Sequence, residues 1–265
     1  MMGTLIPTEM LKLVRQPAIL FWGFLVVPLV AVLLKLVIEG FLVLRMGHRS
    51  AGDVDLFLSA ARGLSLSGNS LGHLLFALGV ASVFFLEYRY STWRLLVPRY
   101  ARFELYAAKL IVCLAWLALG LLVVVLGDMA LNLLFFLIKG QDGGALLVTS
   151  GSFSLLVVAA GIAFLELAVL ASLVAVIVVI FRSMIAAVLS AFLLAIGSTL
   201  LQLYLGADAD RLPLPSYAAR ALRDWLLAGG SEVPAMLGFA VLLGWLVVLN
   251  GLGLAVFSRQ QLAVE

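Results

Sequence analysis

Residues 87–109 of the chain read EYRYSTWRLLVPRYARFELYAAK, and this stretch decides how the rest of the chain is arranged. It is a long polar interval dominated by positive charge, and long apolar segments flank it on both sides. Its basic residues are Arg89, Arg94, Arg99, Arg102 and Lys109, set against the acids Glu87 and Glu104. Because basic loops resist translocation, this loop is predicted to lie on the cytoplasmic side of a membrane.

Aromatic side chains are interleaved with these charges and give the loop an amphipathic character. They are Tyr88, Tyr90, Trp93, Tyr100, Phe103 and Tyr106. One interpretation is an ordinary positive-inside loop with interfacial aromatic residues. The other is a docking element for a cytoplasmic partner. Charge alone favours the first interpretation and leaves the second open.

The composition identifies an integral membrane protein. Of the 265 residues, 65% are hydrophobic and only 12% are charged, whereas a soluble domain carries about 25% charged residues. The net charge of +3 is spread over loops rather than gathered on one face, which argues against a nucleic-acid partner. The single cysteine, Cys113, lies within an apolar segment, so no disulfide within the chain is expected.

Apolar segments and helical periodicity predict an all-α fold with a single transmembrane domain over residues 1–265. We expect an interfacial helix at 5–16, and six spans at about 18–38, 71–87, 110–130, 153–181, 184–205 and 234–257. A short external amphipathic helix is expected between spans five and six, ended by Gly229-Gly230. In the loop at 40–69 we also expect a short surface helix near 53–62.

The distribution of basic residues predicts that both termini are cytoplasmic. In that orientation nine Lys and Arg lie on the inner side and seven on the outer side. The margin is small, but the inner charges lie on very short segments, and short loops carry the topological signal.

Ionisable residues within the spans are candidate functional residues. Glu166 lies near the middle of the fourth span, where it is costly unless it is paired or protonated. A functional role and a neutral packing role both remain open for it. Lys35 and Glu39 are four residues apart near the end of the first span, and we expect them to pair and to reach the interface by snorkelling.

The motifs of several enzyme classes do not occur. The sequence has no His-Glu-x-x-His helix for zinc and no Gly-Lys dipeptide for a phosphate-binding loop. We therefore predict no catalytic residue, no metal site and no cofactor on this chain. If nucleotide energy is used, another chain must bind the nucleotide.

The basic loop contains a recognisable series of residues. An acidic residue is followed by a small-Thr step, by Arg with paired leucines, and by an Arg seven residues before a Lys. These are Glu87, Ser91-Thr92, Arg94-Leu95-Leu96, Arg102 and Lys109. With this series and its six spans, the whole chain resembles a permease subunit of an ABC-2 type (type V exporter) ABC transporter. That family more often has Gly at the position of Ser91, and Arg102 lies about one residue further from Pro98 than its pattern suggests.

The resemblance implies a coupling helix around residues 91–98, seated on a separate ATPase subunit that binds ATP and Mg. The implied coupling residues are Glu87, Ser91, Thr92, Trp93, Arg94, Leu95, Leu96, Arg99, Arg102 and Lys109. Trp93 and the paired leucines would fill an apolar groove on the ATPase, and Arg94 and Arg99 would orient the contact through carboxylates at its rim.

The resemblance also implies how the transporter is assembled. A second permease copy or a paralogue would complete a path lined by spans one, two and five, and export would follow alternating access. The expected location is the cell membrane, as a multi-pass protein of the bacterial inner (cytoplasmic) membrane in contact with its lipids. The transported substrate is not indicated. The alternative is a non-transport membrane scaffold or sensor subunit that recruits a cytoplasmic partner through the loop 87–109.

Overall fold

The computed structural model describes residues 2–46, 53–139, 145–206, 212–229 and 232–260. The described chain is almost entirely helical, with one short two-stranded sheet. Six helices are long and apolar enough to cross a membrane, which confirms the predicted all-α integral membrane fold. The elements in chain order are α1 (Met2–Val14), α2 (Pro17–Leu20), the π-helix η1 (Phe21–Leu25), α3 (Val26–Met46), β1 (Val54–Asp55), α4 (Leu56–Gly63), the 3-10 helix η3 (Leu64–Gly68), α5 (Ser70–Arg89), α6 (Trp93–Leu96), α7 (Arg102–Lys139), β2 (Leu146–Leu147), α8 (Ser150–Phe181), α9 (Met184–Leu205), α10 (Pro215–Ala228) and α11 (Glu232–Arg259).

The first and third spans are longer than the sequence predicted. Helix α7 runs without a break for 38 residues, which at 1.5 Å per residue is about 57 Å. The hydrocarbon core of a bilayer is only about 30 Å thick, so α7 extends well beyond it. Helix α3 likewise continues to Met46 and packs along α7. The predicted spans at 18–38 and 110–130 describe the parts that cross the membrane, and both helices continue beyond these bounds.

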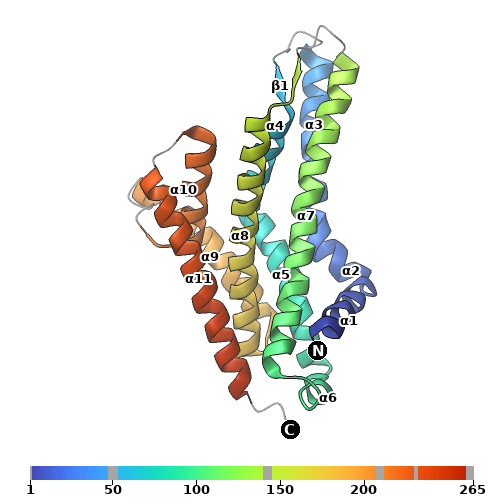
Figure 1. The fold of residues 1–265 in the computed structure, drawn as a ribbon, viewed down its shortest axis with the longest axis vertical. Coiled ribbons are helices and arrows are strands. Elements are labelled where there is room, and N and C mark those ends of the chain that lie inside the picture. The colour runs from blue at the N-terminus through green and yellow to red at the C-terminus, as the bar shows by residue number, and fades with distance from the viewer. Residues whose placement is uncertain (1, 47–52, 140–144, 207–211, 230–231, 261–265) are drawn as a thin grey trace.

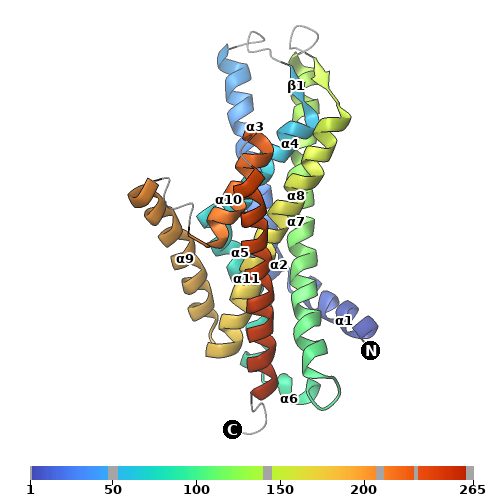
Figure 2. The ribbon, with the colours of Figure 1, turned by 60° about the vertical axis from the view of Figure 1, so that its left-hand side comes forward.

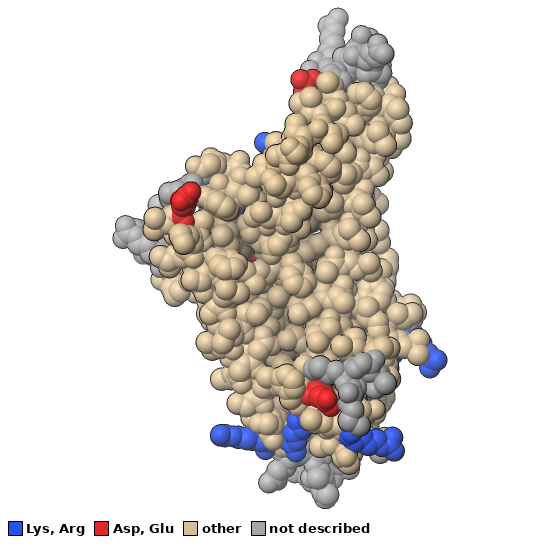
Figure 3. Space-filling model, in the orientation of Figure 1, with Lys and Arg blue, Asp and Glu red and all other residues tan. Residues whose placement is uncertain are grey.

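The two ends of the molecule differ in charge. The start of α1, the short helix α6 and the end of α11 lie at one end, and β1 with the tips of α3 and α7 lies at the other (Figure 1). Lys and Arg side chains gather at the first end, which we call the basal end (Figure 3). The broad band above them is almost free of charge on the face shown, as a membrane-embedded surface requires.

Helix α8 lies at the centre of the bundle and packs against α5, α7, α9 and α11. Helix α9 lies on the outside of the bundle and contacts α5 and α8 (Figure 2). Its small residues Ala187, Ala191 and Ala195 follow one another at intervals of four and are all buried, so they serve packing within the chain.

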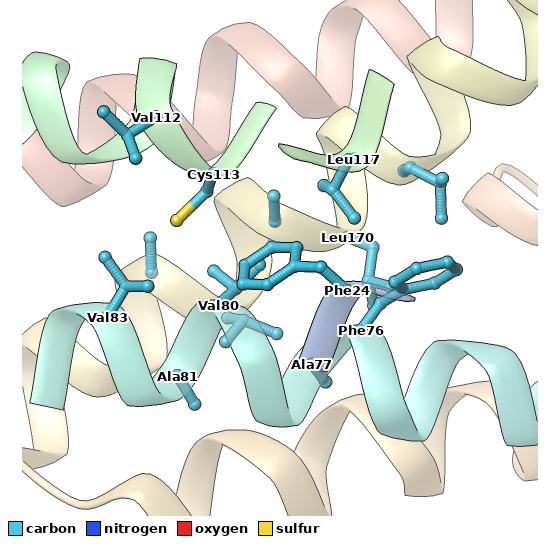
Figure 4. Close-up of a cluster of buried hydrophobic side chains, with 14 of the residues drawn as sticks. Phe24, Phe76, Ala77, Val80, Ala81, Val83, Val112, Cys113, Leu117 and Leu170 are labelled. Atoms are coloured by element: carbon cyan, nitrogen blue, oxygen red, sulfur yellow. The ribbon is translucent and has the colours of Figure 1, made fainter. Parts of the chain in front are cut away.

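Close backbone contact fixes the crossing of the first two spans. A Cβ atom added at Gly23 would lie 2.3 Å from the Cα of Gly79, so neither position has room for a side chain. The π-helix η1 contains Gly23 and places Phe24 in the core beside Phe76 and Leu117 (Figure 4). The irregular turn in the first span is the π-helical segment at residues 21–25.

Two short helices complete the bundle. Helix α4 was expected on the surface, but its Ala60 and Ala61 are buried against α7 and α8. The predicted helix between spans five and six is confirmed as α10, which ends at Gly229 with a φ of 69°. Helix α10 packs against α8 and α11. Its charged residue Arg223 lies beside Glu166, near the middle of α8.

Candidate functional site

Four charged residues form a closed cluster at the basal end. Glu87, in the last turn of α5, accepts hydrogen bonds from Lys109 of α7 at 2.9 Å and from Lys12 of α1 at 3.1 Å. Glu9 of α1 accepts from the same two lysines, each at 2.6 Å. We call Glu9, Lys12, Glu87 and Lys109 the basal ion cluster. It joins α1, α5 and α7 by alternating charges.

The basal ion cluster is largely shielded from solvent. The side chain of Lys109 is 2% exposed and those of Glu9 and Glu87 are 6% exposed, whereas that of Lys12 is 43% exposed. The ammonium group of Lys109 also lies 5.5 Å from the centre of the Trp93 ring. Glu87 and Lys109, two of the implied coupling residues, therefore face inward and are paired with each other rather than presented to a partner.

The pKa of the Glu9 carboxyl lies below its ordinary value of 4.5. Burial alone would raise this pKa, but the charge of Lys109 and hydrogen bonds from Lys109 and Lys12 together lower it by more. A carboxyl whose pKa is lowered by folding contributes stability above its unfolded pKa and loses that contribution as the pH falls through the folded value. The contribution of Glu9 is therefore expected to be complete above pH 4.5 and to disappear below it.

This linkage gives a direct prediction. Glu9→Gln should lower the Tm at neutral pH, because Lys109 and Lys12 lose a charged partner. The difference in Tm between this variant and the wild type should become smaller as the pH falls below 4.5, because protonated Glu9 then resembles Gln. Thermal unfolding in detergent at a series of pH values tests this. A difference that stays constant into the acid range would contradict the assignment.

Trp93 lies inside the chain. Its side chain is almost fully buried, and its ring packs edge-on against Phe257 of α11, with ring centres 4.8 Å apart, and against Tyr88 at 5.8 Å. The prediction that Trp93 fills a groove on a partner is wrong for this structure, because the indole is already enclosed. The apolar face of the loop closes over the end of its own bundle.

Thr92 and Arg102 also make contacts within the chain. The hydroxyl of Thr92 donates to Glu87, which fixes the start of α6 to the basal ion cluster. The guanidinium of Arg102 donates to the carbonyls of Phe257, Ser258 and Gln260 at 2.6 to 3.0 Å. Arg102 therefore satisfies the carbonyl groups at the end of α11, where a positive charge is also favoured by the helix dipole.

The outer surface of the loop is formed by other residues. Tyr90, Ser91, Pro98 and Arg99 are exposed, and we call these four residues the basal face. Ser91 has a φ of 53°, in the left-handed region that favours Gly, which accounts for the Gly more common there in the resembling family. Leu96 is half-buried, and the side chains of Arg94 and Leu95 lie outside the described part of the structure.

Glu166 has a partner that the sequence did not reveal. Its side chain is 2% exposed, and its carboxylate accepts from the guanidinium of Arg223 at 2.6 Å. His73 of α5 lies nearby, with its Nε2 3.9 Å from the carboxylate. Arg223 comes from α10, so the pair joins the helix between spans five and six to the middle of span four. Glu166 is thus a buried charged residue in an ion pair.

Lys35 forms a second interior cluster rather than snorkelling. Its ammonium group donates hydrogen bonds to Asp128 and Asn132 of α7, the second at 2.9 Å. It also donates to Ser59 of α4 at 3.0 Å. The carboxylate of Glu39 lies 3.5 Å away. The expectation of a simple Lys35–Glu39 pair missed Asp128. The available signal was that Asp128 and Asn132 are four residues apart and so share one face of an otherwise apolar helix.

No group suited to holding a metal ion appears among the residues with assigned positions: nowhere in them do three His, Cys, Asp or Glu side chains come together. The arrangement instead consists of buried ion pairs that join helices to one another, and of an exposed face at the basal end.

The six spans, the interior ion pairs and the charged basal end define a multi-pass membrane protein. A family model described as ABC-2 family transporter protein matches residues 5–198, and the chain belongs to this family. It is the permease subunit of an ABC transporter. The match extends from α1 into α9. It therefore includes the whole of residues 87–109, which we call the basal loop. Comparisons with curated proteins and with solved structures found no match.

Proposed function

We propose that this permease belongs to an ATP-driven exporter and that it couples export to ATP hydrolysis on a separate nucleotide-binding subunit. The basal face is the docking surface for that subunit. The observation that carries this proposal is the construction of the basal loop. Thr92 and Trp93 contact other parts of the chain, while Tyr90, Ser91, Pro98 and Arg99 remain exposed at the charged end.

The contacts of the loop explain how movement would be transmitted. Thr92 connects α6 to Glu87, and through the basal ion cluster to α1, α5 and α7. Trp93 and Arg102 connect the loop to the end of α11. A displacement of α6 by the ATPase would therefore move several elements together rather than bend one loop. This rigid connection suits alternating access, in which parts of a transporter move as units.

We also propose that two permease chains form the transport path. Spans one, two and five are neighbours, since η1 packs against α5 and α5 packs against α9. Helix α9 exposes large apolar residues, including Leu189, Leu193 and Leu200, that a second copy could cover. We expect the purified complex to have a mass that corresponds to two permease chains and two ATPase chains.

The docking proposal predicts the effect of changing the basal face. Arg99→Glu combined with Tyr90→Ala should reduce co-purification of the ATPase subunit by tenfold or more and abolish substrate-stimulated ATP hydrolysis. The Tm of the permease alone should stay unchanged, because both side chains are exposed. Arg259→Glu, an exposed residue in the last turn of α11, is the matched control and should retain binding.

Two results would overturn the docking proposal. One is full association and stimulation in the double variant. The other is a loss of binding that is equal in the Arg259→Glu control. If the basal face instead bound a partner without ATPase activity, the scaffold or sensor alternative would take its place.

The proposed topology places the basal end in the cytoplasm. In a Cys113→Ser background, single cysteines should be placed at Arg99 and at Val148, which is exposed at the opposite end. An impermeant thiol reagent added to intact cells should label position 148 and leave position 99 unlabelled until the cells are opened. The reverse pattern would invert the orientation.

A further inference from the structure

A cavity of about 220 Å³ lies between α5, α8, α9, α10 and α11, next to the Glu166–Arg223 pair. Its polar lining includes His73, Thr199, Gln202, Arg220 and Arg223. Its apolar lining includes Leu170, Leu173, Ala191 and Leu194. The coupling mechanism proposed above does not use this cavity.

The polar and apolar parts of the lining lie at different ends of the cavity. Helices α8 and α9 run in opposite directions along it. On α9, Gln202 follows Ala191 by eleven residues, which is about 16 Å along the helix. On α8, Leu173 lies about 10 Å further toward the basal end than Glu166. The cavity therefore has a polar end next to α10 and an apolar end deeper among the spans.

The charges at the polar end favour an anion. The carboxylate of Glu166 is engaged by Arg223, so its charge is compensated. Within the described residues Arg220 makes only a long contact, 3.7 Å, between its Nε and Asp224, and both side chains are at least half exposed. An ion pair of this kind contributes little, so the guanidinium of Arg220 can bind another group.

His73 adds a second polar group with spare capacity. It lines the cavity and is almost fully buried, and its Nε2 has no hydrogen-bond partner within the described ranges. A buried polar atom without a partner is costly, and a ligand that accepts a hydrogen bond from it would remove that cost.

Gly68 leaves room for the guanidinium of Arg223, because a Cβ there would lie 2.5 Å from its Nη2.

We propose that this cavity binds a single-chain amphipathic molecule with an anionic head, either a carboxylate or a phosphate monoester. The head would contact Arg220 and His73, and the chain would lie along Leu170, Leu173 and Leu194. The volume is below the 300–1,000 Å³ or so of typical drug-sized sites, so it holds the head and the first carbons of the chain. The proposal concerns binding within one permease chain and does not depend on the ATPase or on export.

The experiment uses the full chain in lipid nanodiscs, with the Tm measured against ligand concentration. Decyl phosphate and decanoate should each raise the Tm in a saturable way, because a ligand that binds the folded state stabilises it. Decyltrimethylammonium and decyl maltoside, which have the same chain with a cationic and a neutral head, should not. Inorganic phosphate, which lacks the chain, should not either.

Variants locate the effect in this cavity. Arg220→Gln should raise the concentration for half-maximal stabilisation by about tenfold, since a charge-assisted hydrogen bond is lost. Arg220→Lys should retain most of the affinity. Arg62→Gln, an exposed arginine on α4 that does not line the cavity, is the control and should behave as the wild type. The Tm without ligand should be the same in all three variants, because both arginines are on the surface.

Each possible result supports or overturns the proposal. Equal stabilisation by the cationic amphiphile, or an unchanged response in Arg220→Gln, would show that the head is not bound here. Stabilisation by inorganic phosphate alone, equal to that by decyl phosphate, would show that the apolar end is not used. A shift with decyl phosphate but none with decanoate would restrict the site to phosphate monoesters and leave its position supported.

Discussion

Replacing Lys109 with Met is expected to destabilise the permease by about 3–5 kcal/mol, because it leaves buried carboxylates without their shared partner. Lys109 bonds both Glu9 and Glu87, and all three side chains are at least nine-tenths buried. Met keeps the length and the apolar stem of the side chain and removes only the ammonium group, which lies over the Trp93 ring, so the loss reports on charge rather than on packing. The free energy of unfolding in detergent, measured with a chemical denaturant, gives the value directly.

The matched control is Lys12→Met. Lys12 contacts the same two carboxylates, but its side chain is 43% exposed and Lys109 remains in place. Its loss should cost less than about 1 kcal/mol. Converting both acids to Gln in the Lys109→Met background should recover most of the stability, because no buried charge is then left unpaired. Equal losses in the two lysine variants would show that the basal ion cluster is not a buried unit.

Hydropathy predicted the architecture because crossing a membrane is a local requirement. Each span needs about 20 apolar residues, and such segments can be counted along the sequence. The six spans were reached in this way, whereas the family was recognised from the residue series of the basic loop together with those spans. Helices α3 and α7 continue beyond the predicted spans, because composition marks the part of a helix that crosses the membrane and not where the helix stops.

The ion pairs could not be predicted from the sequence because they join residues far apart in the chain. Lys109 and Glu9 are 100 residues apart, Arg223 and Glu166 are 57 apart, and Lys35 and Asp128 are 93 apart. Helical spacing relates only residues three or four positions apart. It therefore suggested Lys35–Glu39, which is present at 3.5 Å, and gave no indication of the shorter contacts across the bundle.

The basal loop shows that an amphipathic pattern does not reveal which surface covers its apolar face. Trp93 and the leucines of 95–96 predict an apolar face that must be covered. The covering surface can be a partner or the end of the same bundle, and the pattern is the same in both cases. The structure places Phe257, more than 160 residues later in the chain, against Trp93. Which loop residues remain exposed thus depends on the packing of the last span.

Replacing Arg223 with Met should have the second largest effect, a loss of about 3–5 kcal/mol in the free energy of unfolding. The carboxylate of Glu166 is buried in the middle of span four, and Arg223 bonds it at 2.6 Å. Without Arg223, α10 loses its charged link to α8, and the buried carboxylate of Glu166 loses the guanidinium that bonds it. Arg220→Met changes an exposed arginine of the same helix and should cost less than about 1 kcal/mol.

The double variant Glu166→Gln with Arg223→Met separates pairing from function. If Glu166 only balances Arg223, removing both charges should restore most of the stability and leave transport unchanged, because buried ion pairs can often be replaced by uncharged residues. If Glu166 takes part in transport, stability should return while transport, or its pH dependence, stays altered. Denaturation in detergent and transport by the reconstituted complex give the two readouts. Wild-type stability in Arg223→Met alone would show that the pair makes no net contribution, and the link between α10 and α8 would then rest on apolar packing.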